Sequence, residues 1–321
     1  MNLFNQVSLN NLMFFIISLV SGILLGPIVI PQLRKLKFGQ AIREEGPQSH
    51  LYKTGTPTMG GLIFIVAFLM PIAFTLAFES NQVIFVALSI LAFGAIGFLD
   101  DYLKVVKKHN EGLKAKQKFG LQLIFAIAFT WFSSTWGFET HIPFVTELVD
   151  LGWLYIPLVI IMFVAIDNAV NLTDGLDGLA ASVTLVVSIF FFFVALKQEH
   201  DIAMYLSAAM AGGLLAYLKF NWHPAKVFMG DTGSLALGGY VGAMAILLKI
   251  PLFIPIFGLI YFIETLSVMI QVGVYKKTKK RVFKMAPIHH HFEMSGWNEI
   301  KIVSVFSGVT IIMCLISYII I

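Results

Sequence analysis

The sequence predicts an all-α integral membrane protein with about ten transmembrane helices in a single domain, residues 1–321. Of the 321 residues, 58% are hydrophobic and 12% are charged, and the mean hydropathy is +0.85. A soluble domain carries about 25% charged residues, so these charges are too few to cover a surface in water. The single cysteine, Cys314, excludes a disulfide-stapled secreted domain. We therefore expect lipid to be the solvent for most of the surface.

Ten segments are long and apolar enough to be membrane spans, because about 20 residues cross roughly 30 Å of hydrocarbon. The first follows an N-terminus without Lys or Arg and lacks a small-residue cleavage pattern. We therefore expect a retained helix and not a removed signal peptide. The expected spans are residues 12–32, 57–78, 82–100, 119–137, 152–168, 179–196, 202–218, 233–249, 251–273 and 302–321.

The basic residues predict the side of the membrane on which each loop lies. With ten spans, five loops on one side hold 20 of the 22 Lys and Arg residues. Positive residues gather in cytoplasmic loops, so we expect these five loops in the cytoplasm and both termini outside. The net charge of +4 then reflects topology, and no nucleic-acid partner is expected. The five loops are 34–56, 103–118, 169–178, 219–232 and 274–301.

Two adjacent carboxylates, Asp100 and Asp101, lie at the cytoplasmic end of the third expected span. Adjacent like charges at a membrane boundary are costly, and a bound cation or nearby lysines would relieve that cost. On a helix their side chains point about 100° apart, so we expect them to have different tasks. A solvated helix end without a function is the alternative.

Four residues with hard oxygen ligands lie at and just after the end of the fifth expected span, in the run DNAVNLTDGLDGLA. Their spacing of three or four residues would align them in one stripe on a helix, whereas the two glycines favour a tight turn. Mg²⁺ prefers a few carboxylates with water and phosphate oxygens, so we expect a cation or phosphate site here. An ordinary helix-loop-helix connection is the alternative. The four residues are Asp167, Asn171, Asp174 and Asp177.

The fourth cytoplasmic loop ends in GDTGS, which places Asp231 between two glycines just before an expected helix. Backbone amides at a helix N-terminus attract phosphate, and an aspartate there can hold a metal that bridges to it. No GK[ST] follows, so this is not a Walker P-loop. A simple N-cap is the alternative for Asp231. Phe228 either stacks on a base or anchors the chain at the membrane interface.

The last expected cytoplasmic loop contains the consecutive histidines His289, His290 and His291. HExxH is absent, which argues against zinc hydrolysis, and imidazoles that donate to phosphate oxygens fit better. The basic run at 276–281 is expected to hold anionic lipid headgroups. Glu264 lies within the ninth span and is a functional candidate because charge is costly there; simple pairing or snorkelling is the alternative.

Together these motifs resemble the phospho-N-acetylmuramoyl-pentapeptide transferase family. This family lies in the glycosyltransferase 4 superfamily of polyprenyl-phosphate N-acetylhexosamine-1-phosphate transferases. The aspartate motifs fit the whole superfamily, whereas PIHHHFE with TPTMGG points to the muramoyl-pentapeptide branch. The matching pieces are GTPTMGG at 55–61, GFLDDYLK at 97–104, NLTDGLDGLA at 171–180, NWHPAKVFMGDTGSLALGG at 221–239 and PIHHHFE at 287–293.

The resemblance implies a Mg²⁺-dependent reaction at the cell membrane, the first membrane step of peptidoglycan synthesis. Phospho-N-acetylmuramoyl-pentapeptide would move from its UDP carrier to undecaprenyl phosphate, giving lipid I and UMP. The resemblance also suggests a dimer. It implies Asp231 as the Mg²⁺ ligand and Asp100 and Asp101 near the lipid phosphate. For the nucleotide site, with Phe228 against uracil, it implies Lys53, Asn171, Asp174, Gly175, Leu176, Asp177, Asn221 and Phe228. For phosphate or sugar contacts it implies Thr58, Lys104, Lys108, Lys116, Gln271 and the three histidines.

Two other functions stay open on the sequence alone. A sister transferase that uses UDP-N-acetylglucosamine would differ in donor specificity, and PIHHHFE argues against it. A transporter or flippase of an anionic lipid or nucleotide sugar would place polar groups near the membrane midplane. Only Glu264 and Asp167 favour that class, because the other polar candidates gather at one face.

Overall fold

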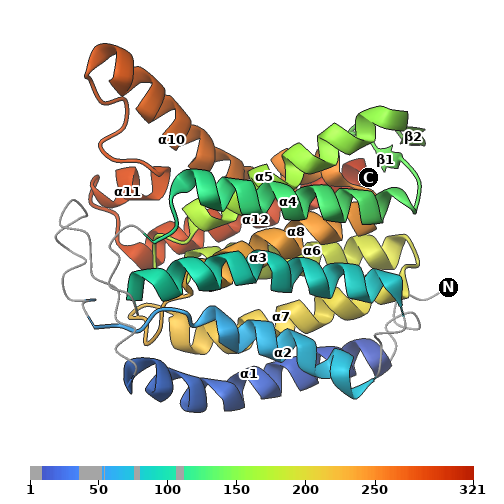
Figure 1. Cartoon of the computed structure of the whole chain (residues 1–321), viewed down its shortest axis with the longest axis horizontal. Coiled ribbons are helices and arrows are strands. Elements are labelled where there is room, and N and C mark those ends of the chain that lie inside the picture. Colours follow the sequence, from blue (N-terminus) through green and yellow to red (C-terminus); the bar gives the residue numbers. More distant parts are fainter. Residues whose placement is uncertain (1–8, 36–52, 54, 76–79, 106–111) are drawn as a thin grey trace.

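The computed structural model describes residues 9–35, 53, 55–75, 80–105 and 112–321. In these ranges the chain forms long helices that lie side by side (Figure 1), with one short hairpin. The helices are α1 Leu9–Lys35, α2 Gly61–Phe74, α3 Asn81–Val105, α4 Ala115–Ser134, α5 Tyr155–Thr173, α6 Leu179–Lys197, α7 Asp201–Asn221, α8 Gly230–Leu247, α9 Ile254–Phe257, α10 Leu259–Thr278, α11 Ile288–Glu293 and α12 Glu299–Ile320. Each of the ten predicted spans overlaps a helix, but the second span contains only the 14-residue helix α2 and the ninth is divided between α9 and α10.

The prediction of a helical, multi-pass membrane protein is confirmed. Among the described residues, seven helices are long and apolar enough to cross a membrane: α1, α3, α5, α6, α7, α10 and α12. Helix α2 is apolar but has 14 residues. Large apolar side chains point outward from the outer helices, as Trp131 of α4, Met269 of α10 and Ile312 of α12 do. Such side chains are stable against lipid and would be an aggregation hazard in water.

Helix α8 lies at the centre of the bundle. Every residue from Thr232 to Leu247 is buried, and α8 packs against α2, α3, α5 and α6. Its small residues let the neighbouring backbones come close, as small residues do between membrane helices. A Cβ at Gly238 would lie 2.4 Å from the Cα of Asp167 on α5. The start of α8 is therefore held by several helices at once.

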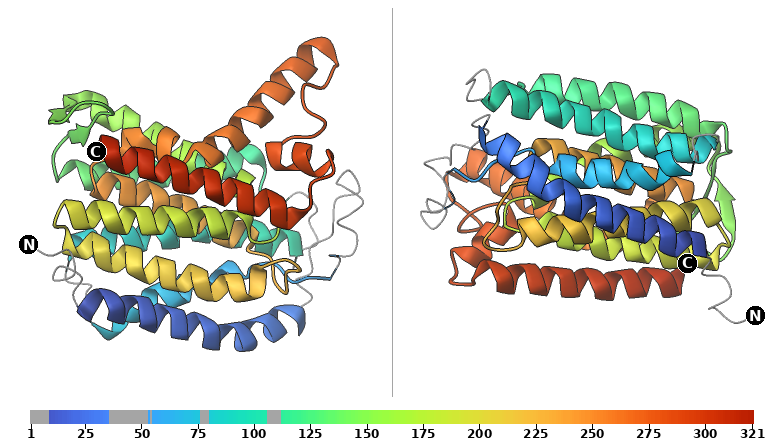
Figure 2. Two further views of the ribbon diagram at one scale, coloured as in Figure 1. Left: turned by 180° about the vertical axis from the view of Figure 1, so that it is seen from behind. Right: turned by 90° about the horizontal axis from the view of Figure 1, so that it is seen from below.

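The two ends of the bundle differ. The end of α3, the start of α4, the turn between α5 and α6, the start of α8 and helix α11 lie at one end (Figures 1 and 2). The hairpin and the C-terminus lie at the other end. Helix α10 leaves the bundle at an angle (Figure 1), and its buried residues, Ile260, Tyr261, Glu264 and Ser267, all lie in its first half.

A short hairpin that the sequence did not predict follows α4. Strands β1 Glu139–His141 and β2 Leu148–Asp150 pair antiparallel, with Thr140 opposite Val149. The His141 backbone N–H also donates to the Lys249 carbonyl, at 2.8 Å. Backbone groups in a connection need partners, and pairing of the two strands supplies them. No alternating apolar pattern marks strands as short as these.

Two predicted span boundaries are also wrong. Helix α5 continues to Thr173, so Asn171 lies on its last turn instead of in a loop. The predicted ninth span, 251–273, is divided at Gly258, where α9 ends and α10 begins. Pro255 lies in the first turn of α9, and proline removes a backbone donor while glycine tolerates irregular dihedral angles.

Candidate active site

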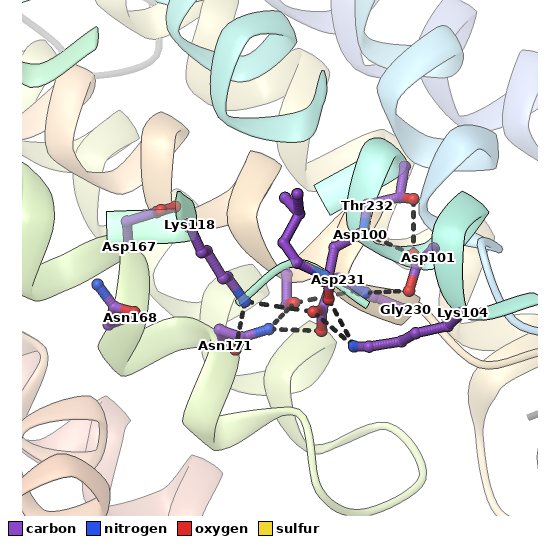
Figure 3. A network of polar contacts seen from close by, with 12 residues as sticks. Asp100, Asp101, Lys104, Lys118, Asp167, Asn168, Asn171, Gly230, Asp231 and Thr232 are labelled. Atoms are coloured by element: carbon purple, nitrogen blue, oxygen red, sulfur yellow. Dashed lines mark hydrogen bonds and ion pairs between the residues drawn. The ribbon is translucent and has the colours of Figure 1, made fainter. Parts of the chain in front are cut away.

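Asp231 is the centre of a polar network at the start of α8 (Figure 3). Its Oδ2 accepts from Lys104 Nζ of α3 at 3.1 Å and from Lys118 Nζ of α4 at 3.2 Å. Its Oδ1 accepts from Asn171 Nδ2 of α5 at 2.9 Å. The side chain is 21% exposed, so a ligand can reach it. Four helices thus meet at one carboxylate that lies beside two ammonium groups.

A close approach of α3 to α8 fixes the position of Asp231. A Cβ at Gly97 of α3 would lie 2.0 Å from the Asp231 carbonyl oxygen. A Cβ at Gly61 of α2 would lie 2.2 Å from the Cα of Gly233. Only glycine permits backbones at these separations, so both glycines set the location of the first turn of α8.

Asp101 caps the start of α8 from the neighbouring helix α3 (Figure 3). Its Oδ1 accepts from the Asp231 backbone N–H at 3.2 Å. Its Oδ2 accepts from the Thr232 N–H at 2.9 Å and the Thr232 hydroxyl at 2.7 Å. A carboxylate at a helix N-terminus pairs with free N–H groups and with the positive end of the helix dipole. Asp101 therefore positions the helix that carries Asp231.

Asp100 has different partners, as the expected 100° separation of the pair predicts. Its Oδ1 accepts from the Leu113 N–H at 2.6 Å, and its Oδ2 forms an ion pair with Lys104 Nζ. Lys104 lies one turn along α3 and also reaches Asp231. Asp100 therefore orients a lysine of the site and ties the start of α4 to α3.

We expect Asp101→Asn to destabilise the protein by about 1–3 kcal/mol, because hydrogen bonds to a buried charged group are lost. An amide would also turn a donor toward the N–H groups of α8. Thr232→Val removes the hydroxyl donor alone and should cost about 1 kcal/mol. Thermal unfolding of both variants in detergent measures the difference. Equal unfolding temperatures in both variants and the parent would contradict the capping role.

A second cluster is centred on Lys53. Lys53 Nζ donates to Asp177 Oδ1 at 2.8 Å and to Glu299 Oε2 at 2.7 Å. Asp177 Oδ2 accepts from the Ala225 N–H at 3.0 Å and lies 3.0 Å from His223 Nδ1. Lys53, Asp177 and Glu299 are buried. The cluster joins segments from four parts of the chain.

The loops around this cluster are held by backbone hydrogen bonds. Asn221 accepts from the Gly178 N–H at 3.1 Å and donates to the Val227 carbonyl at 2.9 Å. The Phe228 N–H donates to the Pro57 carbonyl, and the Phe228 carbonyl accepts from the Gly60 N–H, both at 2.8 Å. Asn221 thus fixes the two loops that flank the Lys53 cluster, and Phe228 lies beside the segment at 57–60.

The three histidines have three different environments. His289 is fully buried, its Nδ1 lies 3.0 Å from Glu264 Oε2, and a Cβ at Gly175 would lie 2.1 Å from its Nε2. His290 Nδ1 lies 3.1 Å from Glu293 Oε2. His291 Nδ1 accepts from the Lys284 N–H at 3.1 Å. The His289 and His290 rings lie against each other, with 4.1 Å between their centroids, whereas the His291 ring lies against Phe283. Glu264 pairs with His289 inside the protein.

The remaining predicted residues lie around these two clusters. Thr58 and Leu176 are buried, and the Thr58 hydroxyl lies 2.6 Å from where a Cβ on Gly230 would be. Asp174 caps the end of α5. Gln271 of α10 accepts from the Val282 and Phe283 N–H groups and holds that loop. Lys116 is exposed near the start of α4. Lys108 lies outside the described residues.

Two groups of side chains offer ligands for a cation. Asp177, His223 and Glu299 place one ligand atom each within 4.8 Å of one another, but Lys53 already contributes a positive charge there. Asp231 offers a partly exposed carboxylate beside the Asn171 amide. Hard oxygen donors of this kind, completed by water and phosphate oxygens, suit Mg²⁺. Lysines lie beside both groups, Lys53 in the first and Lys104 and Lys118 in the second. The Asp231 side chain differs in being 21% exposed, so a cation could reach it.

Comparisons with known proteins show the family of the chain. The family model for glycosyl transferase family 4 matches residues 83–249, and the phospho-N-acetylmuramoyl-pentapeptide-transferase signature 1 matches residues 53–65. The phospho-N-acetylmuramoyl-pentapeptide-transferase of Clostridium botulinum (strain Alaska E43 / Type E3) is 54% identical over 309 residues, 96% of this chain and 94% of the relative. The protein of the same name from Clostridium perfringens (strain 13 / Type A) is 51% identical, over 95% of this chain and 97% of its own length.

The chain belongs to the phospho-N-acetylmuramoyl-pentapeptide-transferase family. The signature of this transferase family begins at Lys53, the centre of the second cluster. The match to family 4 includes the carboxylates Asp100, Asp101 and Asp231. The Asp231 network and the Lys53 cluster, apart from Glu299, therefore lie within the segments that the two family models match.

The motifs do not reveal several residues of the site. Lys118 contacts both Asp231 and Asn171, Thr232 donates to Asp101, and Glu299 accepts from Lys53. Lys118 had a weak signal, because it is the last basic residue before an expected span. Glu299 had none, because a glutamate that starts a helix is ordinary.

Proposed function

We propose that this protein transfers phospho-N-acetylmuramoyl-pentapeptide from UDP-N-acetylmuramoyl-pentapeptide to undecaprenyl phosphate. The products are lipid I and UMP, and the step belongs to peptidoglycan synthesis. The names and the extent of the relatives support the choice of substrates. The observation that carries the proposal is a partly exposed carboxylate, Asp231, that lies beside the Lys104 and Lys118 ammonium groups at one end of a membrane bundle.

The main barrier to this reaction is the approach of two anions. A phosphate monoester has its second pKa near 6, so the lipid phosphate is largely a dianion at neutral pH and needs no general base. Its oxygen attacks the phosphorus of the sugar phosphate, the bond to the UMP phosphate breaks, and UMP leaves. Lys104 and Lys118 reduce the repulsion between the two anions. Asp231 and Asn171 would hold the Mg²⁺, which neutralises charge on the diphosphate.

The two clusters suggest how the donor lies in the site. The Lys53 ammonium contacts two carboxylates, so this cluster carries no net positive charge to attract phosphate. It offers hydrogen bonds instead, which suits the uncharged uracil base, with Phe228 nearby as a ring to stack on. The phosphates would then lie toward Lys104, Lys118 and Asp231.

We further propose ten membrane crossings with both termini outside and the site on the cytoplasmic face. The five predicted cytoplasmic loops, one of which contains Asp231, hold 20 of the 22 basic residues, as expected for that side of the membrane. A nucleotide-linked donor is made in the cytosol, which fits the same side. The basic run at 276–281 would contact anionic lipid headgroups. We also propose a homodimer, because the family resemblance suggests one.

Release of UMP by the purified protein in detergent tests the proposal. We expect UMP when undecaprenyl phosphate, UDP-N-acetylmuramoyl-pentapeptide and Mg²⁺ are all present, and a loss of about 100-fold or more when EDTA removes the metal. UDP-N-acetylglucosamine replaces the donor in a parallel reaction. UMP from that donor would assign the protein to the sister branch. No UMP from either donor with folded protein would contradict a transferase.

A further inference from the structure

Glu299 is the first residue of α12 and is buried in the Lys53 cluster. Its Oε2 accepts from Lys53 Nζ at 2.7 Å and from the Asp177 backbone N–H at 3.1 Å. Its Oε1 lies 3.7 Å from His223 Nδ1. One carboxylate therefore joins α12 to three other segments of the chain.

The carboxylate of Glu299 adds a second negative group beside the Lys53 ammonium group. Lys53 is paired with both Asp177 and Glu299, so two negative groups face one ammonium group. A lysine side chain has a flexible four-carbon stem and loses much conformational freedom when its ammonium group is held in one place. Two carboxylates on different elements define the position of the ammonium group better than Asp177 alone.

The backbone of the turn between α5 and α6 depends on the same atom. The Asp177 N–H is buried and donates to Glu299 Oε2, and a buried donor that loses its partner destabilises the conformation that buries it. Gly178 follows directly in a left-handed conformation, with φ of 77°. Loss of the Glu299 carboxylate would thus release both a side chain and a turn that the proposed donor site uses.

We propose that Glu299 is a positioning residue for the nucleotide part of the donor. It holds the Lys53 ammonium group and the Asp177 backbone where the nucleotide binds, and it makes the start of α12 part of the donor site. This inference rests on the proposed function. Because Glu299 belongs to the Lys53 cluster and not to the Asp231 network, its effect falls on donor binding and leaves the reacting groups in place.

Steady-state kinetics of Glu299→Gln tests the inference. We expect the KM for UDP-N-acetylmuramoyl-pentapeptide to rise about tenfold or more, since a hydrogen bond to a charged group is lost. The kcat and the KM for undecaprenyl phosphate should change less than about twofold. The Kd for UMP, measured by calorimetry, should rise by the same factor as the KM for the donor. Glu299→Asp, which keeps the charge, should recover part of the loss.

Two controls separate this effect from general damage. Glu139→Gln removes an ion pair of the same length, 2.7 Å to Lys249, at the opposite end of the bundle, and should leave all constants unchanged. In a Lys53→Met background, Glu299→Gln should add less than about twofold to the Kd for UMP, because the two residues act together. Thermal unfolding of each variant shows whether it is folded. If Glu299→Gln does not fold, the constants of Glu299→Asp are compared with those of the wild type instead.

Three outcomes are distinguishable. A rise in the KM for the donor and the Kd for UMP alone supports the inference. Equal losses in kcat and in the KM of both substrates, or no change in any constant, would overturn it while the wild-type activity keeps the proposed function. A wild-type protein that neither binds UMP nor releases it from the donor would overturn both.

Discussion

Asp231→Asn should lower kcat for UMP release by about 100- to 1000-fold while the protein stays folded. The amide has the same size as the carboxylate but lacks the charge that binds a cation and orients two lysines. Lys104, Lys118 and Asn171 all donate to the Asp231 oxygens, so an amide in this place also loses acceptors. The measurement is UMP release at saturating concentrations of both substrates.

The same experiment compares Asp231 with the adjacent pair. Asp100→Asn and Asp101→Asn should lose less activity, because these carboxylates contact Lys104 and the start of α8 and act on the site through them. Asp201→Asn is the matched control, since Asp201 is an exposed aspartate in the first turn of α7 at the opposite end. Near-normal turnover of Asp231→Asn would exclude Asp231 as the metal ligand.

Gly97→Ala should reduce activity by about 100-fold, the scale expected when a site moves by about 1 Å. The added Cβ would lie 2.0 Å from the Asp231 carbonyl oxygen and 2.6 Å from the Thr232 nitrogen. These are backbone atoms at the start of a buried helix and cannot rotate away, so α3 and α8 must separate. The loss should appear in kcat and in the unfolding temperature together.

Gly308→Ala is the matched control for this change. Gly308 lies inside α12, and a Cβ there would have no described atom within 4 Å. Alanine has the higher helix propensity, by about 1 kcal/mol, so this variant should be as stable as the parent or slightly more stable. Full activity of Gly97→Ala would show that the approach of α3 does not set the position of Asp231.

The fold was largely predictable because a membrane-spanning helix must be apolar over a continuous segment of the sequence. An apolar run of about 20 residues identifies a helix without knowledge of its neighbours. The break at Gly258 and the hairpin at 139–150 depend instead on a few residues and on tertiary contacts such as that of His141 with Lys249. These features have no periodic signal.

The site was predictable where its residues fall within local motifs. Asp231 and Asn171 were found in this way and do meet. Regular spacing was a poorer guide to contacts: it suggested that Asn171 and Asp177 share one stripe, but α5 ends at Thr173 and the turn directs Asp177 to Lys53. Glu299 and Lys53 are 246 residues apart, so only the fold brings them together.

The burial of α8 from Thr232 to Leu247 has a consequence for how the protein responds to its membrane. A bilayer thicker or thinner than the apolar length of a helix makes that helix tilt or makes its flanking residues shift. Such mismatch acts first on helices with large lipid-facing side chains, such as α4, α10 and α12. The sixteen residues from Thr232 to Leu247 are shielded by other helices, so the carboxylate at the start of α8 is insulated from changes in bilayer thickness.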